Sequence, residues 1–267
     1  MIHNVLSIAG SDPSGGAGIQ ADLKTFAANG TYGMAALTAL TAQNTRGVSG
    51  VETVPPAFVQ AQIAAVFDDI RVDAVKIGMI ATADIASAVA EVLSRHPGVP
   101  IVLDPVMVAK GGATLLDEDA IAAVKTTLLP LATVVTPNLA EAGRLLDLPQ
   151  ATDRRGMAKQ AAALVDLGPR AALVKGGHLD GSDSPDVLHD MHDAHWLDAA
   201  RTPGRNTHGT GCTLSSALAA HLAKGATIHD AARAAKCYVT GAISAADTLC
   251  VGQGHGPVHH FHALWKD

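Results

Sequence analysis

Residues 4–28 read NVLSIAGSDPSGGAGIQADLKTFAA, which is an apolar run, a glycine-rich loop and a helical segment in that order. The run Asn4–Ala9 predicts a strand, and the segment from about Ala17 to Ala28 predicts a helix. Strand, loop and helix in this order form the first half of a βα unit. Because α/β proteins bind ligands at the carboxyl ends of parallel strands, the stretch predicts an α/β fold with a ligand site at its loop. A plain glycine turn is the alternative for this loop taken alone.

The alternation of strand and helix continues through most of the chain. Further strands are expected at Gly33–Leu40, Asp73–Ile80, Pro100–Asp104, Thr133–Thr136 and Ala171–Val174. A further helix is expected after Pro55 and Pro56, with apolar residues at Phe58, Ile63, Val66 and Phe67. Other helices are expected at Thr82–Arg95, Asp117–Leu129, about Leu139–Leu146, about Arg154–Leu167, after the glycine motif at 206–218 to about Lys224, and Thr227–Ala246. Val187–Leu197 alternates weakly and predicts an antiparallel hairpin at a sheet edge. No linker divides the chain, so we predict one three-layer α/β/α domain over residues 1–267 with a mainly parallel central sheet.

Composition narrows the class of protein. A net charge of −6 argues against a general nucleic-acid binder, which would need a basic face. The uncharged run Thr25–Thr45 is interrupted by polar residues, so it is a poor membrane span, and no secretory signal is visible. The three cysteines are widely spaced and form neither a paired metal motif nor a disulfide framework. We therefore expect a cytoplasmic protein without a membrane partner.

A second glycine motif, NTHGTGCTLSSAL at residues 206–218, precedes an alanine-rich helical segment. Gly209 and Gly211 bracket Thr210 and can point successive N–H groups into one concavity. The start of a helix adds the positive end of its dipole, so the motif predicts an anion site. Cys212 lies at this helix start, where we expect a lowered thiol pKa and a better base or nucleophile. The alternative is a helix-capping turn in which Cys212 is buried packing.

Polar residues repeatedly follow apolar strands, at Asp12, Gln43, Asp104, Asn138 and Lys175. In a parallel sheet these positions share one rim. Asp104 and Glu141 are hard oxygen donors suited to Mg²⁺, held directly or through water. Lys175 is a cation that can follow a migrating phosphate. Carboxylates, a lysine and an anion site on one rim favour phosphoryl transfer from a metal–nucleotide.

Seven segments, in order along essentially the whole chain, carry a resemblance to a known family. They are GSDPSGGAGIQADLK at 10–24, TAQNT at 41–45, KIGM at 76–79, TPNLAE at 136–141, KGGH at 175–178, THGTGC at 207–212 and GPVHHF at 256–261. Together they resemble the hydroxymethylpyrimidine/phosphomethylpyrimidine kinases of thiamine biosynthesis. The long first segment and the cysteine in the anion loop are specific, whereas the Gly-x-Gly pair alone indicates only the ribokinase superfamily.

The resemblance implies a ribokinase-like fold and a homodimer. It also implies two successive transfers from ATP, the first turning the alcohol of a pyrimidine into a monophosphate and the second turning that phosphate into a diphosphate. Mg²⁺ is the implied cofactor, and a monovalent cation is a further candidate. Sugar kinases of the superfamily carry aspartate where this chain has Cys212, which agrees instead with the pyrimidine and related vitamin kinases.

Substrate-binding roles are implied for Gln43, Gly10, Ala17, Asp22, Met79 and Val106. The Gln43 amide offers one donor and one acceptor, which match the amino group and the adjacent ring nitrogen of a 4-aminopyrimidine. Gly10 and Ala17 would let backbone approach the ring, with Asp22 nearby. Met79 and Val106 would cover its apolar faces, although both are equally plausible as core.

Nucleotide and catalytic roles are implied for the remaining candidates. Asn138 and Glu141 would hold Mg²⁺ and phosphates together with Asp104, Lys175 would bridge the nucleotide phosphates, and Thr207 would contact the nucleotide. Gly209, Thr210 and Gly211 would stabilise the transferring group. Cys212 would accept the hydroxymethyl proton in the first transfer, whereas the second needs no base because a phosphate is already ionised near neutral pH.

Two other functions remain open at this point. A pyridoxal kinase would have the same fold and the same cysteine-bearing loop, and a non-catalytic ligand sensor could use the same scaffold. A dinucleotide-binding oxidoreductase is weaker, because the GxGxxG fingerprint is missing. The loops after Gly10 and Lys110 are candidates to close over a substrate, and the glycine-rich tail Val251–Pro257 is expected to fold back over the site.

Overall fold

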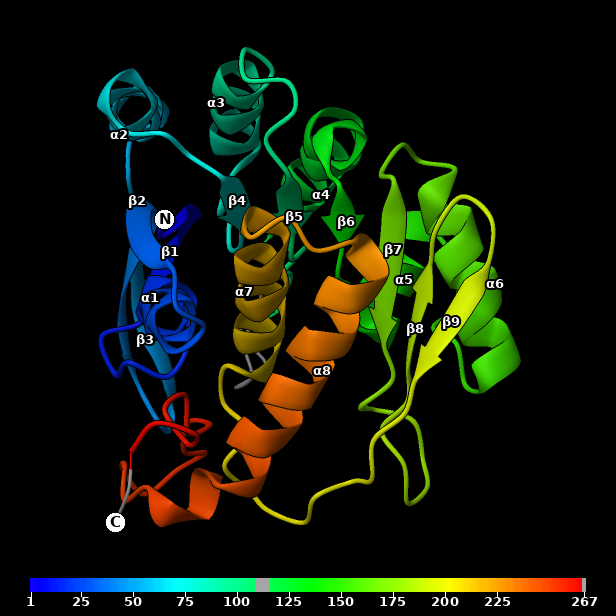
Figure 1. Ribbon diagram of the computed structural model, residues 1–267. Coiled ribbons are helices and arrows are strands. Elements are labelled where there is room, and N and C mark those ends of the chain that lie inside the picture. The colour runs from blue at the N-terminus through cyan, green and yellow to red at the C-terminus, as the bar shows by residue number, and fades with distance from the viewer. Residues whose placement is uncertain (109–115, 266–267) are drawn as a thin grey trace.

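A nine-stranded sheet, in the order β3-β2-β1-β4-β5-β6-β7-β8-β9, organises the computed structural model (Figure 1). The structure describes residues 1–108 and 116–265, so the predicted Lys110 loop lies outside the described residues. The strands are β1 (Asn4–Ser11), β2 (Tyr32–Asn44), β3 (Gly47–Thr53), β4 (Ala74–Ile77), β5 (Ile101–Leu103), β6 (Val134–Val135), β7 (Ala171–Lys175), β8 (Asp186–His189) and β9 (Ala194–Leu197). From β2 to β7 the neighbours are parallel, while β3, β8 and β9 pair antiparallel at the two edges. The predicted α/β class, parallel centre and edge hairpin are confirmed.

Helices cover both faces of the sheet. They are α1 (Gly18–Ala28), α2 (Pro56–Asp69), α3 (Ala83–Leu93), α4 (Glu118–Ala123), α5 (Leu139–Leu146), α6 (Arg154–Val165), α7 (Thr210–Ala223) and α8 (Ile228–Ser244). Helices α1, α7 and α8 lie on one face, and α2 to α6 lie on the other (Figure 1). Thr82 caps the start of α3, since its side chain accepts the Ile85 N–H.

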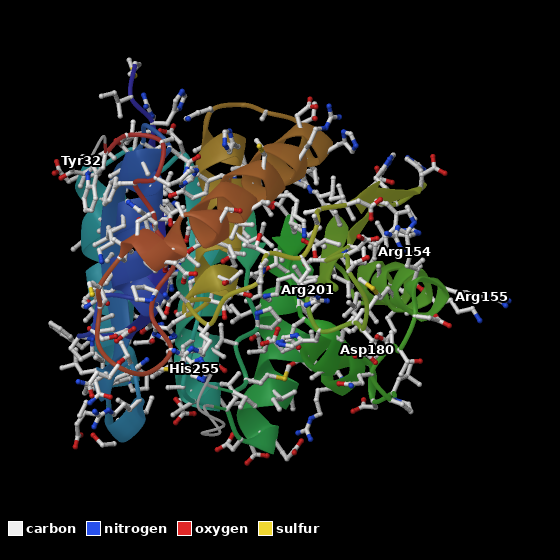
Figure 2. The ribbon with its side chains drawn as sticks, turned by 90° about the horizontal axis from the view of Figure 1, so that it is seen from below. Tyr32, Arg154, Arg155, Asp180, Arg201 and His255 are labelled. Atoms are coloured by element: carbon white, nitrogen blue, oxygen red, sulfur yellow. The ribbon has the colours of Figure 1, made fainter. Side chains whose placement is uncertain are left out.

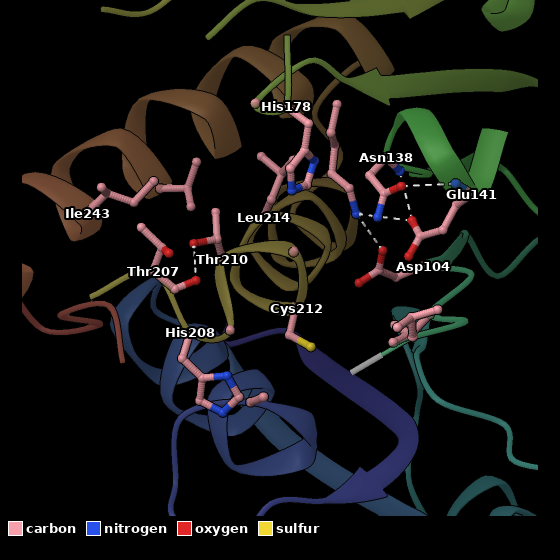
Figure 3. Close-up of a pocket in the computed structure, with 18 of the residues that line it drawn as sticks. Asp104, Asn138, Glu141, His178, Thr207, His208, Thr210, Cys212, Leu214 and Ile243 are labelled. Atoms are coloured by element: carbon pink, nitrogen blue, oxygen red, sulfur yellow. Dashed lines mark hydrogen bonds and ion pairs between the residues drawn. The ribbon is translucent and has the colours of Figure 1, made fainter. Parts of the chain in front are cut away.

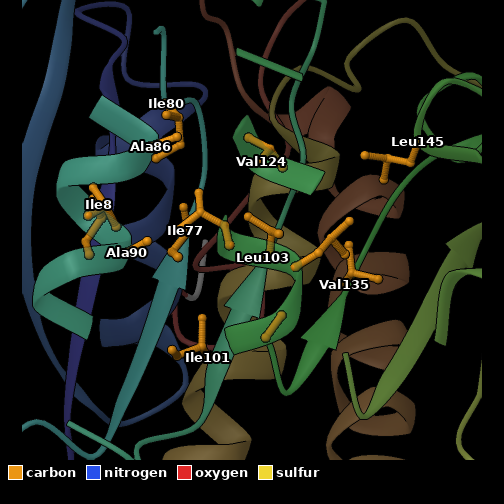
Figure 4. Close-up of a cluster of buried hydrophobic side chains, with 14 of the residues drawn as sticks. Ile8, Ile77, Ile80, Ala86, Ala90, Ile101, Leu103, Val124, Val135 and Leu145 are labelled. Carbon is orange, nitrogen blue, oxygen red and sulfur yellow. The ribbon is translucent and has the colours of Figure 1, made fainter. Parts of the chain in front are cut away.

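Two cores result because successive strand side chains point to opposite faces. Ile101 and Leu103 pack into the core beneath α3 and α4, together with Ile77 and Val135 (Figure 4). Val102, between them on the same strand, packs into the core beneath α1, α7 and α8. Such strands are apolar on both sides, which is why they stood out in the sequence as continuous apolar runs.

Two elements differ from the prediction. Strand β2 continues to Asn44 and forms a hairpin with β3, a strand that was not predicted because its residues are exposed or half-buried and alternate weakly. The helix predicted to reach Leu129 leaves α geometry after Ala123, passing through a π turn at Val124–Leu128 and a 3-10 turn at Leu129–Leu131. Pro130 has no N–H for an α-helical bond, so a regular helix cannot continue through it.

None of the helices in the described part of the chain combines the length and apolar character that crossing a membrane requires.

Candidate functional site

A cavity of about 1080 Å³ lies at the carboxyl ends of the parallel strands (Figure 3). Its wall includes all of the predicted site residues except Asp22, namely Gly10, Ala17, Gln43, Met79, Asp104, Val106, Asn138, Glu141, Lys175, Thr207, Gly209, Thr210, Gly211 and Cys212. These residues come from segments spread over about 200 positions of sequence, so the parallel topology is what brings them together. Their common location was the central expectation from the sequence, and the geometry bears it out.

Lys175 lies between two buried carboxylates. Its Nζ is 2.8 Å from Asp104 Oδ1 and 3.9 Å from Glu141 Oε2. Burial by itself would raise the pKa of Asp104, but the Lys175 and Lys76 ammonium groups outweigh it and hold that pKa below its usual value. Burial raises the pKa of Glu141 to about 7, and the neighbouring Asp104 adds to the rise while Lys175 opposes it. The three groups therefore form one coupled charge cluster that a bound phosphate would enter.

Asn138 and Glu141 form a capping box at the start of α5. The Asn138 side chain accepts the Glu141 N–H at 2.9 Å, and Glu141 Oε2 accepts the Asn138 N–H at 2.7 Å. The cap fixes the carboxylate against Lys175 but occupies one of its oxygens. Among the described residues no cluster of three or more metal-ligating side chains occurs. Two carboxylates with oxygens partly engaged nevertheless fit Mg²⁺, which commonly keeps waters and takes its remaining ligands from substrate phosphates.

The anion loop has the geometry that its glycines suggested. Gly209 adopts φ +77°, and a Cβ there would lie 1.8 Å from the carbonyl oxygen of Gly16, so only glycine fits. Helix α7 begins at the next residue, Thr210. A Cβ on Gly211 would lie 3.3 Å from Lys175 Nζ, which places the N-terminus of α7 against the charge cluster. The start of this helix, where N–H groups lack partners within the helix, and Lys175 thus lie side by side in the cavity wall.

The prediction that the Cys212 thiol has a lowered pKa is wrong. Burial raises the pKa of its thiol to about 11. The Lys76 ammonium and a hydrogen bond from the Gly18 N–H lower it, but they do not compensate for desolvation and for the nearby carboxylates of Asp22 and Asp104. The position at a helix start therefore does not by itself make this thiol acidic, because the surrounding protein excludes the water that would solvate a thiolate.

Asp22 is placed differently from the prediction. Its side chain is completely buried below the cavity and does not line it. It accepts hydrogen bonds from Ser7 Oγ at 2.6 Å, Ser216 Oγ at 2.7 Å and Lys76 Nζ at 2.8 Å. The sequence placed Asp22 near the loop correctly, but only the packing of α1 shows that this face of the helix turns into the core.

Gln43 lies on the cavity side of the β2–β3 hairpin. Thr41 Oγ1 donates to its Oε1 at 3.1 Å, and its Nε2 is 3.4 Å from Nε2 of His208. His208 Nε2 in turn pairs with Asp12 Oδ2 at 2.8 Å. His208 was quoted within the anion motif but given no role, and its position in that motif was the only sequence signal for it.

The glycine-rich tail packs against the β2–β3 hairpin and the anion loop, but none of its residues, Val251–Pro257, lines the cavity. His255 N donates to the carbonyl of Thr45 at 2.9 Å, and Gly254 N donates to Thr45 Oγ1 at 3.1 Å. The next part of the tail pairs with the anion loop, where His208 N donates to the carbonyl of Gly256 at 3.0 Å. The tail therefore connects the hairpin that carries Gln43 to the loop that precedes Cys212.

A further set of cavity residues was missed from the sequence. Lys236 on α8 donates to Asp186 Oδ2 at 2.8 Å and to the Ser184 carbonyl at 2.7 Å. Arg201, visible in Figure 2, donates to backbone carbonyls of the 177–183 loop, including that of Gly177 at 2.8 Å. These contacts shape the wall that continues from Lys175 toward α8, and they depend on a tertiary approach that no local pattern signals.

Comparison with known proteins gives consistent results. A family model described as phosphomethylpyrimidine kinase matches residues 12–259. The hydroxymethylpyrimidine/phosphomethylpyrimidine kinase of Rhizobium meliloti (strain 1021) is 56% identical over 98% of this chain and 98% of its own length. Among solved structures, an ADP complex of Bacillus subtilis pyridoxal kinase matches with a TM-score of 0.90 and 38% identity, covering 98% of this chain and 99% of that one. The phosphomethylpyrimidine kinase of Clostridium difficile 630 matches with a TM-score of 0.80 and 42% identity, covering 90% and 99%.

Proposed function

The chain belongs to the phosphomethylpyrimidine kinase family, and from that premise we propose that it phosphorylates 4-amino-5-hydroxymethyl-2-methylpyrimidine twice, in thiamine diphosphate biosynthesis. Each step takes a phosphoryl group from ATP: the first forms the monophosphate and the second the diphosphate. The observation that carries the proposal is that Lys175, the N-terminus of α7, Cys212 and Gln43 all line one cavity, with Lys175 beside the start of the helix. An anion-binding loop and a side-chain amide that can hydrogen-bond a pyrimidine ring, in one cavity, suit phosphoryl transfer to a small heterocyclic alcohol.

Different residues of the cavity would bind the substrate, stabilise the phosphoryl group and accept the proton. Gln43, Met79 and Val106 would orient the ring, while Gly10 and Ala17 let the backbone approach it. Lys175 and the N–H groups at the start of α7 would stabilise the charge on the transferring phosphoryl group. Cys212, as its thiolate, would accept the hydroxymethyl proton in the first transfer. Asn138 and Thr207, which also line the cavity, would contact the nucleotide.

Asp104 and Glu141 would hold Mg²⁺, through water where their oxygens are already engaged. When bound, the ion would neutralise phosphate charge and align the phosphates. A monovalent cation stays a prediction of the family resemblance.

We further propose a cytoplasmic homodimer. The edge formed by β2 and β3 carries exposed apolar side chains, with Tyr32 60%, Leu40 51% and Val51 45% exposed. Tyr32 is labelled in Figure 2. An apolar strand edge of this kind is normally covered by a partner, and a second copy would cover it symmetrically.

The test of the function is direct. The protein is incubated with Mg-ATP and hydroxymethylpyrimidine, and both monophosphate and diphosphate products are expected. Pyridoxal is assayed side by side, because the structural likeness to a pyridoxal kinase favours it as the second substrate. Turnover of pyridoxal without turnover of the pyrimidine would reverse the proposal. If ATP is not consumed with either substrate, the ligand sensor is favoured. A sensor, however, would have no need to keep Asp104, Glu141, Lys175 and Cys212 together.

Replacement of Gln43 by Glu is expected to weaken pyrimidine binding by about 10- to 100-fold. The carboxylate keeps the acceptor but removes the donor, so one hydrogen bond to the ring becomes an unfavourable contact. The Kd of ATP should be nearly unchanged, and calorimetric titration with each ligand measures both. Equal weakening of the two ligands would mean that Gln43 only supports the hairpin.

Replacement of Gly254 by Val is expected to raise the KM for the pyrimidine by about 10-fold with little change in the KM for ATP. A Cβ at Gly254 would lie 2.0 Å from the Thr45 carbonyl oxygen, so the tail and the hairpin carrying Gln43 must separate. Steady-state kinetics with each substrate varied measure the effect. Gly50→Ala serves as the control, because a Cβ at Gly50 of β3 meets only Ala42 Cβ, at the ordinary contact distance of 3.6 Å. An unchanged pyrimidine KM would show that the tail does not position the hairpin.

A further inference from the structure

A network of buried polar side chains lies directly below the cavity and has no part in the chemistry described so far. Lys76 Nζ donates to both oxygens of Asp22, at 2.9 and 2.8 Å, and both side chains are 0% exposed. Ser7 and Ser216 donate to the same carboxylate. Gly78 leaves the space for this ammonium, since a Cβ there would lie 2.7 Å from Lys76 Nζ. The KIGM segment at 76–79 therefore supplies both the buried cation, Lys76, and the glycine that leaves space for it, Gly78.

Helical periodicity connects this network to Cys212. The Gly18 N–H, at the start of α1, acts on the Cys212 thiol and lowers its pKa, and Asp22 follows Gly18 by four residues. On α7 Ser216 follows Cys212 by four residues and donates to Asp22. Residues four apart share a helix face, so α1 and α7 make two stacked contacts, the upper one at the thiol and the lower one at the carboxylate. Lys76 reaches the lower contact from β4 and also belongs to the cavity wall.

The charges around the thiol come from several elements. Lys76 on β4, Asp22 on α1 and Asp104 after β5 all act on Cys212, and among these charged groups Lys76 has the largest effect. Lys175 on β7 also interacts with the sulfur. Although Asp22 pairs with Lys76, the pair does not cancel at Cys212, because the ammonium acts on the sulfur more strongly than the carboxylate does.

Stability alone does not account for such a pair. Removing two charges from water costs several kcal/mol per ion, and apolar residues of similar volume often stabilise a fold as well or better. A fully buried Lys76–Asp22 pair therefore suggests a use for the positive charge itself.

We propose that Lys76 is a positioning residue for the alcohol transfer: its ammonium, anchored by Asp22, stabilises the Cys212 thiolate that accepts the substrate proton. The inference rests on the proposed function. In that step the O–H bond of the hydroxymethyl group breaks and an S–H bond forms on Cys212. The freed oxygen forms a bond to the γ-phosphorus of ATP, and the bond from that phosphorus to the bridging oxygen breaks, leaving its electron pair on ADP. The phosphate transfer has no proton to remove and does not need Lys76.

The test measures the thiolate directly. Cys237 and Cys250 are exposed and are first replaced by Ser, so that iodoacetamide reports on Cys212. Alkylation is followed by mass spectrometry between pH 8 and pH 10, where its rate follows the thiolate fraction. In this background Lys76→Met is expected to slow alkylation at each pH by at least about tenfold, which corresponds to about one pKa unit. The alcohol transfer should slow by a similar factor, and the phosphate transfer should change little.

Lys236→Met is the matched control. Lys236 is also a buried lysine paired with an aspartate, Asp186, but it is not among the groups with the largest effect on Cys212. Its replacement should leave the alkylation rate of Cys212 unchanged, which separates a specific charge effect from a general loosening of the fold.

A second variant covers the event that Lys76→Met does not fold because Asp22 is left unpaired. Asp22→Leu with Lys76→Met removes both charges, and alkylation should still slow because the effect of Lys76 on the sulfur exceeds that of Asp22. Alkylation unchanged in both variants, or equal slowing of both transfers, would overturn the proposal. If alkylation slows but Cys212→Ala leaves the alcohol transfer intact, the coupling of Lys76 to Cys212 stands and the base role in the proposed function fails.

Discussion

Replacing Cys212 with Ala is expected to slow the alcohol transfer by about 10²- to 10⁴-fold and to leave the phosphate transfer nearly unchanged. The range is that of a positioned general base, and only the alcohol carries a proton that must be removed. Both steps use the same cavity, the same ATP and the same Lys175, so each serves as the internal reference for the other. The measurement is the single-turnover rate of each step with the matching substrate.

The pH dependence sharpens this prediction. With the pKa of the Cys212 thiol raised to about 11, the thiolate is a minor species near neutral pH, and its fraction grows about tenfold per pH unit below the pKa. The rate of the alcohol transfer should therefore rise between about pH 6 and pH 9, and this rise should vanish in Cys212→Ala. Cys237→Ala, an exposed cysteine on α8, is the control and should behave as the native protein. Comparable slowing of both transfers in Cys212→Ala would leave the cysteine a structural role.

Replacing Lys175 with Met is expected to slow both transfers by about 10²- to 10³-fold. Lys175 is placed at the N-terminus of α7, where both reactions develop charge on the transferring phosphoryl group, and losing one such preorganised donor costs about this much. The change also leaves Asp104 and Glu141 without the cation between them. Like charges then face one another, so the pKa of Glu141 should rise further and the affinity for ATP should fall.

Turnover of each substrate and calorimetric binding of ATP test this expectation. Lys125→Met is a suitable control because, within the described residues, Lys125 forms its ion pair with the exposed Asp147, and neither residue lines the cavity. It should leave both rates within about twofold, since an exposed pair contributes little. Loss of only one of the two transfers in Lys175→Met would contradict a shared role at the phosphoryl group.

The contrast between the two variants separates proton removal from charge stabilisation. Cys212 should matter to one step and Lys175 to both. The structure gives the physical basis, because the thiol faces Gly18 and the Lys76–Asp22 pair while Lys175 faces the carboxylates that would hold Mg²⁺.

Some features of the site could not be predicted for identifiable reasons. The family resemblance implied a substrate-binding role for Asp22, but the side of a helix that faces the core depends on how α1 packs against β1 and α7. The pKa of Cys212 was assigned from its place at a helix start, but desolvation by the surrounding chain has the larger effect. Strand β3 was missed because its residues carry little apolar pattern, and its pairing with β2 is what makes it a strand.

The sequence by itself determined the alternation of strands and helices, the polar residues at the strand ends and the two glycine loops, because each depends on neighbours close along the chain. Apolar periodicity, capping and the conformational freedom of glycine are local properties, and a parallel sheet then places the strand ends on one rim whatever the details of packing. Only the tertiary structure decided which side chains are desolvated and which charges face one another. Asp22, Lys76 and Cys212 lie 54 or more positions apart in sequence, and their energies depend on a shared environment that exists only after α1, β4 and α7 have packed together.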